Sequence, residues 1–414
     1  SGGRKRQRGV DEDGEVTNYE FFKTLTEEIT EGTKEGTLKW SQFKQPLFEF
    51  SGACSGCGET PYLKLMTQLF GTNMVIANAT GCSSIYGGTA PSIPYCTNEK
   101  GEGPAWANSL FEDNAEFGLG MRLSIDQTRD TVYQALETLQ TLKISNPLKA
   151  SIENMIALKD QEGTSAVSAA DALISEVESA YNSASGEVRK QLDIAREYRD
   201  YLLDKSVWIV GGDGWAYDIG YGGLDHVIAS GENVNILVLD TEVYSNTGGQ
   251  ASKATSIGAI AKFAASGKKT GKKDLGLMAM SYGYVYVASV NMGSNKQQGL
   301  NAMLEAQAYK GPSIIIAYSP CIAHGFDMRH AMEHGNMASA SGHWPLYRYN
   351  PLSEEKKMKW DSKPASMELK DYLLSEARYK SLQTINPTQA DQLFAKADAD
   401  RKQHMTFLQK LSEL

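Results

Sequence analysis

The residues best suited to chemistry lie in the segment 206–250, where two apolar runs each end in polar residues. The first run leads into Gly-Asp-Gly at 212–214, and the second ends at Asp240 and Thr241. Glycines let a backbone approach phosphate oxygens, and a helix that starts there adds free N–H groups. Ligands of open α/β sheets lie at the carboxyl ends of the strands. The segment therefore predicts a diphosphate site.

The same two turns offer oxygen ligands for a cation. The Asp213 carboxylate follows the first predicted strand, the Thr241 hydroxyl follows the second, and the Val243 carbonyl lies two residues further on. Mg²⁺ prefers octahedral oxygen coordination and commonly takes part of its shell from phosphates. We therefore predict a Mg²⁺–diphosphate site, with Asn246 within reach of the ligand. The alternative is a structural strand–turn–helix without a ligand.

Four of the five cysteines form a second candidate site. Cys82 and Cys321 each follow an apolar run, so they can meet the Cys54-x-x-Cys57 loop at one edge of a sheet. Four thiolates suit either zinc or a 4Fe-4S cluster, and spacing alone does not separate the two. A diphosphate cofactor at the same edge favours the cluster, which would accept the electrons that the cofactor generates. Cys96 is expected to be a free thiol.

Composition limits the class of protein. The 414 residues carry a net charge of -9, which argues against nucleic acid or an anionic membrane as partner. No apolar run is long enough to span a membrane, and no signal peptide is visible. An odd number of cysteines argues against a disulfide framework and favours a cytoplasmic setting. Because the sequence starts at Ser1, we expect it to be a segment of a longer chain.

The pattern of apolar residues predicts an α/β fold with a doubly wound, mostly parallel sheet. Expected strands cover 73–81, 207–210, a run ending at 240, 284–290 and 313–318, and expected helices cover 61–70, near 257–265, and 296–309. We expect three parts: a linker with a short helix (19–31) at 1–43, a cofactor-binding domain at 44–352 with a helical insertion at about 125–204, and a helical C-terminal extension at 353–414. That extension should contain helices at 366–383 and 388–411.

The Gly-Asp-Gly turn and the polar turn after it resemble the thiamin diphosphate motif. That motif begins with Gly-Asp-Gly and ends near a pair of asparagines. Thr241 stands where a metal-binding Asn usually lies. This departure from the motif fits one branch of the superfamily rather than a generic decarboxylase.

Five segments together resemble the pyruvate:ferredoxin oxidoreductase family, specifically its C-terminal, thiamin diphosphate-binding domain. They read FEFSGACSGCGETP at 48–61, ANATGCSSIY at 77–86, GPAWANSLFEDNAEFG at 103–118, GGDGWAYDIG at 211–220 and SNTGGQ at 245–250. The resemblance covers about 44–352 and is very specific. The fold that it implies is the thiamin diphosphate-binding fold.

The resemblance implies roles for individual residues. Cys54, Cys57, Cys82 and Cys321 would hold one 4Fe-4S cluster, and Asp213, Thr241 and the Val243 carbonyl would bind Mg²⁺. Asn246 would assist the chemistry at the substrate. The residues expected to contact thiamin diphosphate are Glu59, Cys82, Gly212, Asp213, Gly214, Trp215, Thr241, Glu242, Val243, Tyr244, Ser245 and Asn246.

The family oxidatively decarboxylates pyruvate to acetyl-CoA and carbon dioxide, with coenzyme A as co-substrate, and passes electrons through clusters to ferredoxin or flavodoxin. The resemblance implies the cytoplasm or a hydrogenosome-like organelle, and a homodimer. Alternatives are electron transfer to a fused NADP reductase, another 2-oxoacid as substrate, or a non-catalytic metal-binding scaffold. The family's pyrimidine-side domain and ferredoxin-like cluster domain have no match here. We therefore expect this chain to need further domains or subunits for activity.

Overall fold

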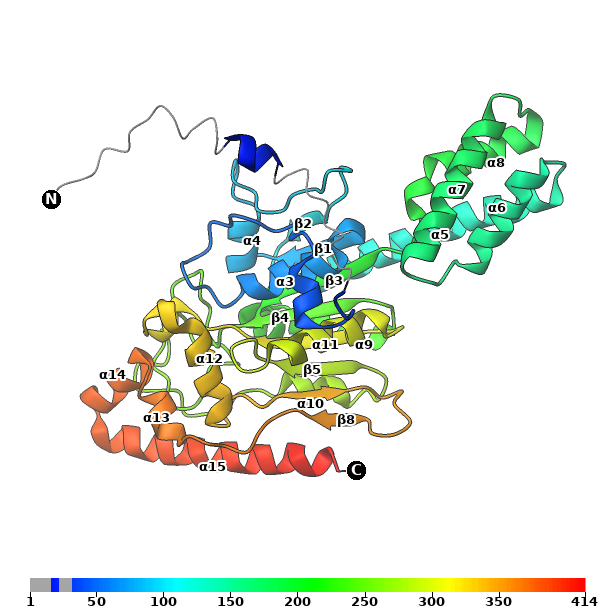
Figure 1. Ribbon diagram of the computed structural model, residues 1–414. Coiled ribbons are helices and arrows are strands. Elements are labelled where there is room, and N and C mark those ends of the chain that lie inside the picture. Colours follow the sequence, from blue (N-terminus) through cyan, green and yellow to red (C-terminus); the bar gives the residue numbers. More distant parts are fainter. Residues whose placement is uncertain (1–15, 22–31, 414) are drawn as a thin grey trace.

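The computed structural model, which describes residues 16–21 and 32–413, is built on one eight-stranded sheet (Figure 1). The strand order is β2-β1-β3-β4-β6-β5-β7-β8; the first six strands run parallel, and β7 and β8 join antiparallel. The strands are β1 (Met74–Ala79), β2 (Ala105–Ser109), β3 (Ser206–Gly212), β4 (Asn235–Asp240), β5 (Tyr286–Val290), β6 (Ser313–Tyr318), β7 (Tyr347–Tyr349) and β8 (Met358–Trp360). The predicted mostly parallel α/β fold is confirmed.

Alternate residues of the central strands enter two different cores, because successive side chains of a strand point to opposite faces. Along β3, Val207 and Ile209 pack into one core, whereas Trp208 and Val210 pack into the other. All six residues of β4 are buried. Apolar runs without alternation are therefore what a parallel sheet covered on both faces requires.

Helices from distant parts of the chain cover the two faces. One core contains residues of α3 (Thr60–Phe70), α4 (Cys82–Gly87) and α11 (Lys296–Ala308). The opposite core contains residues of α5 (Asn114–Thr141), α9 (Tyr221–Ser230), α10 (Leu275–Met280), α12 (Ala331–Ala340), α13 (Leu369–Leu373), α14 (Ala377–Ile385) and α15 (Pro387–Leu411). The short helix α2 (Leu38–Gln42) contacts α3 and α11.

The segment predicted as a helical insertion forms an arm that extends away from the sheet (Figure 1). It consists of the outer part of α5 together with α6 (Asn146–Ala157), α7 (Thr164–Tyr181) and α8 (Gly186–Glu197). These helices share a core of their own, which includes Val132, Leu136, Ile152, Leu173 and Leu192. Near the sheet, the buried Arg122 of α5 pairs with Asp126 and Asp204. The arm therefore packs mainly on itself.

Four local predictions differ from the structure or lie partly outside the described residues. The loop expected between 87 and 118 contains β2 and the start of α5, and the helix expected at 366–383 is divided into α13 and α14. The helix expected near 257–265 is wrong. Gly258 has φ +84, its N–H bonds the Lys268 carbonyl, and the segment folds back as a loop. A helix is expected at 19–31. Residues 16–21 are helical, and residues 22–31 lie outside the described residues.

No helix within residues 16–21 and 32–413 has the length and apolar character that a membrane span requires.

The strand order has a more direct bearing on function, because β1, β3, β4 and β6 are consecutive neighbours in the sheet. The carboxyl ends of these strands lie beside one another, and each is followed by a predicted site residue. The division of the chain into domains at 43 and 352 stays a prediction.

Two glycines of α5 give a matched test of its packing on the sheet. A Cβ on Gly118 would lie 2.4 Å from Ile209 Cγ1 and 2.7 Å from its Cδ1, whereas a Cβ on Gly120 would meet nothing within 4 Å. We expect Gly118→Ala to lower the free energy of unfolding by about 1–3 kcal/mol through overpacking. Gly120→Ala should raise it by about 0.5–1 kcal/mol through helix propensity. Chemical denaturation measures both, and equal effects would contradict the close contact.

Candidate active site

A pocket opens at the carboxyl ends of β1, β3 and β4. All the residues predicted to contact the cofactor line it, except Glu242. The structure adds lining residues that the sequence did not single out: Thr80, Gly81, Ser83, Phe111 and Thr247. Most of these adjoin predicted residues, so their signal was their place after a strand end. The pocket therefore collects the two turns of segment 206–250 and the start of α4 into one cavity.

Three oxygens of different residues converge at the base of this pocket. The Thr241 hydroxyl lies 3.0 Å from Asp213 Oδ1 and 3.0 Å from the Val243 carbonyl oxygen. A hydroxyl has one proton, so it can donate to only one of these two acceptors. Adjacent oxygens of an octahedral Mg²⁺ shell are separated by about 3 Å when the metal–oxygen bonds are about 2.1 Å. Both separations from the Thr241 hydroxyl are therefore compatible with adjacent ligand positions in such a shell.

Asp213 is almost completely buried, with an exposed fraction of 1%. Its Oδ2 accepts a 2.6 Å hydrogen bond from the Ser252 hydroxyl, and its Oδ1 accepts from the Thr241 backbone N–H at 3.3 Å. Burial, reinforced by the charge of Asp240, raises the pKa of Asp213 to about 8. A divalent cation beside the carboxylate would favour its ionised form and offset that burial cost.

The backbone around Asp213 is shaped by close aromatic contacts. A Cβ on Gly214 would lie 2.3 Å from the Tyr244 ring, and one on Gly211 would lie 2.4 Å from the Trp215 ring. At Gly212 a Cβ would meet only the Leu239 carbonyl, at 3.8 Å. After Gly-Asp-Gly the chain forms the π-helix η3 (Gly214–Ile219), a geometry that often marks functional sites. The strand end therefore presents open backbone to the pocket.

The far wall of the pocket carries a buried acid and a thiol. Glu59 has an exposed fraction of 4% and accepts a 2.8 Å hydrogen bond from the Tyr86 hydroxyl. Burial raises the pKa of Glu59 to about 7, although the bond from Tyr86 opposes this. Cys82, at the start of α4, lies 3.1 Å from the Ser245 hydroxyl. Burial, followed by the charge of Glu59, raises the pKa of the Cys82 thiol to about 12.

The loop of Cys54 and Cys57 packs against the segment that contains Cys321. The Gly58 N–H donates to the Pro320 carbonyl at 3.0 Å, and a Cβ on Gly58 would lie 2.4 Å from Pro320 N. Burial is the main cause that raises the pKa of Cys57, Cys82 and Cys321, and neighbouring thiols add to it: Cys321 acts on Cys57 and Cys82, and Cys54 acts on Cys82 and Cys321. The predicted cysteine set therefore gathers at one edge.

The thiols do not converge on one point. Among residues 16–21 and 32–413, no group of three or more His, Cys, Asp or Glu side chains is arranged to hold a metal ion. A single zinc ion needs all four thiolates at one point, whereas a cubane cluster binds each thiolate to a different iron. Cys96 lies apart, with its thiol 3.9 Å from the Pro46 carbonyl.

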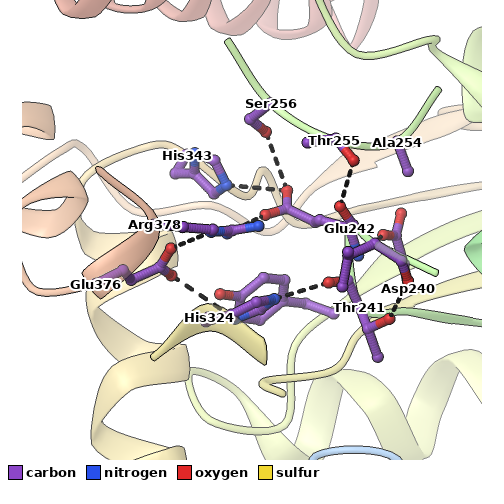
Figure 2. Close-up of polar contacts among 12 residues, drawn as sticks. Asp240, Thr241, Glu242, Ala254, Thr255, Ser256, His324, His343, Glu376 and Arg378 are labelled. Carbon is purple, nitrogen blue, oxygen red and sulfur yellow. Dashed lines mark hydrogen bonds and ion pairs between the residues drawn. The ribbon is translucent and has the colours of Figure 1, made fainter. Parts of the chain in front are cut away.

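Glu242 occupies a different place from the one predicted. Its side chain is absent from the pocket lining and enters a buried polar network on the opposite side of the turn, shown in Figure 2. Arg378 donates to its carboxylate at 2.7 Å and His343 lies 3.0 Å from it. Sequence reasoning missed both partners, because neither belongs to a local motif and each lies more than 100 residues from Glu242 along the chain.

Thr241 offers a test of the oxygen triangle without any ligand. Thr241→Val keeps the shape but removes the hydroxyl, which leaves one buried acceptor, Asp213 Oδ1 or the Val243 carbonyl, without this donor. We expect a loss of about 1–3 kcal/mol in the free energy of unfolding. Thr241→Ser keeps the hydroxyl and should cost about 1 kcal/mol or less for the missing methyl. Urea unfolding of both variants measures these losses. Equal losses in the free energy of unfolding would show that the hydroxyl contacts contribute nothing to stability.

Comparison with known proteins identifies the central part of the chain. Residues 194–317 match the family model described as thiamine pyrophosphate enzyme, C-terminal TPP binding domain. This stretch includes β3 and β4 and both turns of the oxygen triangle, whereas the four cysteines lie outside it. The match is consistent with a diphosphate site at the ends of these two strands.

Curated relatives match almost the whole chain. Pyruvate:ferredoxin oxidoreductase of Moorella thermoacetica is 55% identical over 403 residues, which is 96% of this chain and 34% of the relative. Pyruvate-flavodoxin oxidoreductase of Klebsiella pneumoniae is 52% identical over 384 residues, 92% of this chain and 32% of the relative. The chain thus spans about a third of the length of these relatives.

A solved structure of 2-oxoglutarate:ferredoxin oxidoreductase from Magnetococcus marinus aligns with a TM-score of 0.41 and 14% identity, over 70% of this chain and 78% of that one. This likeness is too low to support an inference. The sequence identities with the curated relatives are sufficient by themselves to show homology. Over nearly all of its length, the chain is homologous to a segment that makes up about a third of the length of these pyruvate:ferredoxin and pyruvate-flavodoxin oxidoreductases, and its residues 194–317 match the C-terminal TPP binding domain of thiamine pyrophosphate enzymes.

Proposed function

We propose that this chain is the part of a pyruvate oxidoreductase that binds thiamin diphosphate, Mg²⁺ and one 4Fe-4S cluster. The complete enzyme would oxidatively decarboxylate pyruvate to acetyl-CoA and carbon dioxide, with ferredoxin or flavodoxin as electron acceptor. The observation that carries the proposal is the convergence of oxygens from Asp213, Thr241 and Val243 in a pocket that Cys82 also lines. The names of the relatives supply the substrate and the acceptor.

The cation site fits Mg²⁺ in ligand chemistry. A carboxylate, a hydroxyl and a carbonyl oxygen are hard donors, and none of the three is sulfur or nitrogen. Asp213 is the anionic member, and the cation would bridge it to the diphosphate. Phosphate oxygens and water would supply the remaining ligands of a bound Mg²⁺. Mg²⁺ is thus a template that orients the cofactor.

The pocket also fits the rest of the diphosphate half of the cofactor. The open backbone at Gly212 would lie along the phosphates, as proposed for Gly212 to Trp215. The Trp215 Nε1–H is buried and has no partner within the described chain, so it is a donor in need of an acceptor. Tyr244, Ser245 and Asn246 close the other side. The diphosphate proposal therefore rests on the open backbone at Gly212, because the Trp215 Nε1 lies beside Gly220, where a Cβ would be 2.6 Å from it.

The cysteine edge fits a cluster rather than an isolated metal. The loop of Cys54 and Cys57 is held to the Cys321 segment by a backbone hydrogen bond and close backbone contacts. Helix α4, which begins at Cys82, bonds the same loop through Tyr86 and Glu59. Iron would favour ionised thiolates, and so oppose the burial that raises the pKa of Cys57, Cys82 and Cys321. Cys82 belongs to both sites, because it lines the cofactor pocket. It would therefore be the cluster ligand that lies beside the cofactor.

Bound thiamin diphosphate would supply the carbon nucleophile and the electron sink for decarboxylation. The protein's part is to hold the diphosphate end with the oxygen triangle, exclude water with the buried walls of the pocket, and place Glu59 at the opposite wall. Asn246 is exposed on the rim and lines the pocket, which suits a role at the substrate. We propose as partners the remaining segments of the enzyme, a second copy of it, and ferredoxin or flavodoxin, in the cytoplasm.

Removal of the anionic ligand tests the cation site. Asp213→Ala should abolish Mg²⁺-dependent binding of thiamin diphosphate, with a loss of affinity on the order of 100-fold or more, because the cation loses its only charged protein ligand. Isothermal titration in millimolar cofactor, with and without Mg²⁺, measures this. Asp225→Ala is the control, since Asp225 instead accepts a hydrogen bond from the Tyr282 hydroxyl. Retained affinity in Asp213→Ala would refute the site.

Removal of one thiol tests the cluster. Cys321→Ser should lose or degrade the cluster of anaerobically purified protein while the far-ultraviolet circular dichroism stays unchanged. Iron analysis and the absorbance shoulder in the violet report the cluster, and zinc analysis excludes the mononuclear alternative. Cys96→Ser, which changes the thiol outside the set, should keep full iron content. An unchanged cluster in Cys321→Ser would remove Cys321 from the ligand set.

A further inference from the structure

The turn that carries two of the three proposed cation ligands contains a residue with unusual backbone geometry. Glu242 has φ +58, a left-handed conformation that side chains other than glycine and asparagine rarely adopt. It stands between Thr241 and Val243, and its conformation reverses the chain so that the Thr241 hydroxyl reaches the Val243 carbonyl at 3.0 Å. Conformations of this kind persist only where surrounding contacts fix them.

Both backbone groups of Glu242 are fixed by side chains. Its N–H donates to Asp240 Oδ1 at 3.0 Å, and its carbonyl accepts from the Thr255 hydroxyl at 2.6 Å. Asp240 is in turn paired with Lys272 at 2.8 Å. The conformation of the turn therefore depends on residues on both sides of it, and not on local propensity.

The carboxylate of Glu242 is the most heavily bonded group in the network (Figure 2). Oε2 accepts from Arg378 Nη2 at 2.7 Å; Oε1 lies 3.0 Å from His343 Nε2 and 3.2 Å from the Ser256 hydroxyl. Lys272 Nζ lies 3.4 Å from Oε1. Burial alone would disfavour this charge, but His343, Lys272 and Arg378 together hold the pKa of Glu242 well below its ordinary value.

Arg378 links this carboxylate to the C-terminal part of the chain. It is the second residue of α14, is 7% exposed, and also pairs with Glu376, the residue before that helix. Glu376 accepts from the Tyr372 hydroxyl at 3.0 Å and lies 3.2 Å from His334 Nε2. A planar guanidinium can bond two carboxylates at once, which a lysine cannot reproduce. Arg378 thus ties the turn to α13, α12 and α14 together.

A second connection reaches the same turn from the cysteine side. His324 Nε2 bonds the Thr241 carbonyl at 2.7 Å, and its Nδ1 lies 3.7 Å from Glu376. His324 ends the short helix that follows Cys321, and it is fully buried. Glu376 is therefore connected to the turn by two routes. Arg378 leads to the Glu242 side chain, and His324 leads to the Thr241 carbonyl.

We propose that the buried Glu242–Arg378 ion pair is a positioning device for the cation site, which holds the left-handed turn so that the Thr241 hydroxyl and the Val243 carbonyl face one cation. The proposal rests on the proposed function and extends it to residues that touch neither cation nor cofactor. It makes the C-terminal extension part of the working site. Replacing one partner of a buried ion pair leaves the other unpaired, so the turn is expected to relax toward a conformation in which the two oxygens separate.

The test compares Arg378 with an arginine of equal burial elsewhere. Arg378→Met removes both bonds of the guanidinium, and Arg378→Lys keeps the charge but not the fork. Arg122→Met is the matched control, because Arg122 is 1% exposed and pairs with two aspartates at the base of the arm. Each full-length variant is titrated with Mn²⁺ in saturating thiamin diphosphate. Electron paramagnetic resonance reports both affinity and the symmetry of the bound ion.

We expect Arg378→Met to weaken Mn²⁺ binding by about tenfold or more and to broaden the spectrum of the bound ion, with Arg378→Lys intermediate. Arg122→Met should lower the melting temperature but leave Mn²⁺ affinity within about twofold. If Arg378→Met does not fold, Arg378→Lys decides, with an expected loss of about threefold.

Three outcomes would contradict the proposal. Wild-type affinity and spectrum in the folded Arg378 variants would remove the positioning role while the cation site stands. An equal loss in Arg122→Met would show that the effect is general destabilisation. Absence of thiamin diphosphate-dependent Mn²⁺ binding in the wild-type chain would overturn the proposed cation site itself, which separates failure of the function from failure of this inference.

Discussion

The constraint on which the site depends is the burial of the Asp213 carboxylate between two neighbouring strand ends. A carboxylate with 1% exposure has to be neutral, paired or bound to a cation. Its partners here are two hydroxyls and one backbone N–H, none of them charged. The sheet thus leaves an acid whose ionised form lacks a counter-charge within hydrogen-bond distance. This is the electrostatic condition that a divalent cation satisfies, and the order β3-β4 makes it unavoidable, because both strand ends meet at that point.

Thr241 to Val243 separate two buried polar regions of different character. Glu242 and Asp240 are surrounded by Lys272, Arg378 and His343, so their charges are compensated within the protein. On the pocket side, the hydrogen-bond partners of Asp213 within the described chain are all uncharged, and Lys272 acts on it only from a distance. One turn therefore faces a compensated network and an uncompensated acid at the same time. Because strong pairing on one side leaves the Glu242 carboxylate little freedom, the chain at this turn is fixed before any ligand binds, as preorganised sites require.

The sequence was sufficient to predict the sheet edge and the pocket, since the relevant information is local. Apolar runs followed by Gly-Asp-Gly, by Thr241 and by Cys82 show where strands end, and parallel strands bring their ends together. The side-chain direction of Glu242 could not be predicted, because it follows from φ +58 and from Arg378, which is 136 residues away. The false helix near 257–265 has a similar cause: its apolar residues pack against α15, whose Leu393 and Phe394 approach Gly258. Long-range contacts decide both cases.

The C-terminal helices contribute a buried ion pair whose role is geometric rather than stabilising. Such a pair contributes little net stability, because desolvation of both charges offsets their attraction. Apolar residues of the same size would serve α13, α14 and the sheet at least as well if packing were their only task. A pair that bonds a left-handed residue beside two pocket oxygens has a geometric effect that apolar contacts cannot give, since only directional bonds fix the rotation of a turn. The presence of charged groups at Arg378, Glu376 and Glu242 is therefore better explained by the position of the Thr241 hydroxyl than by the stability of the core.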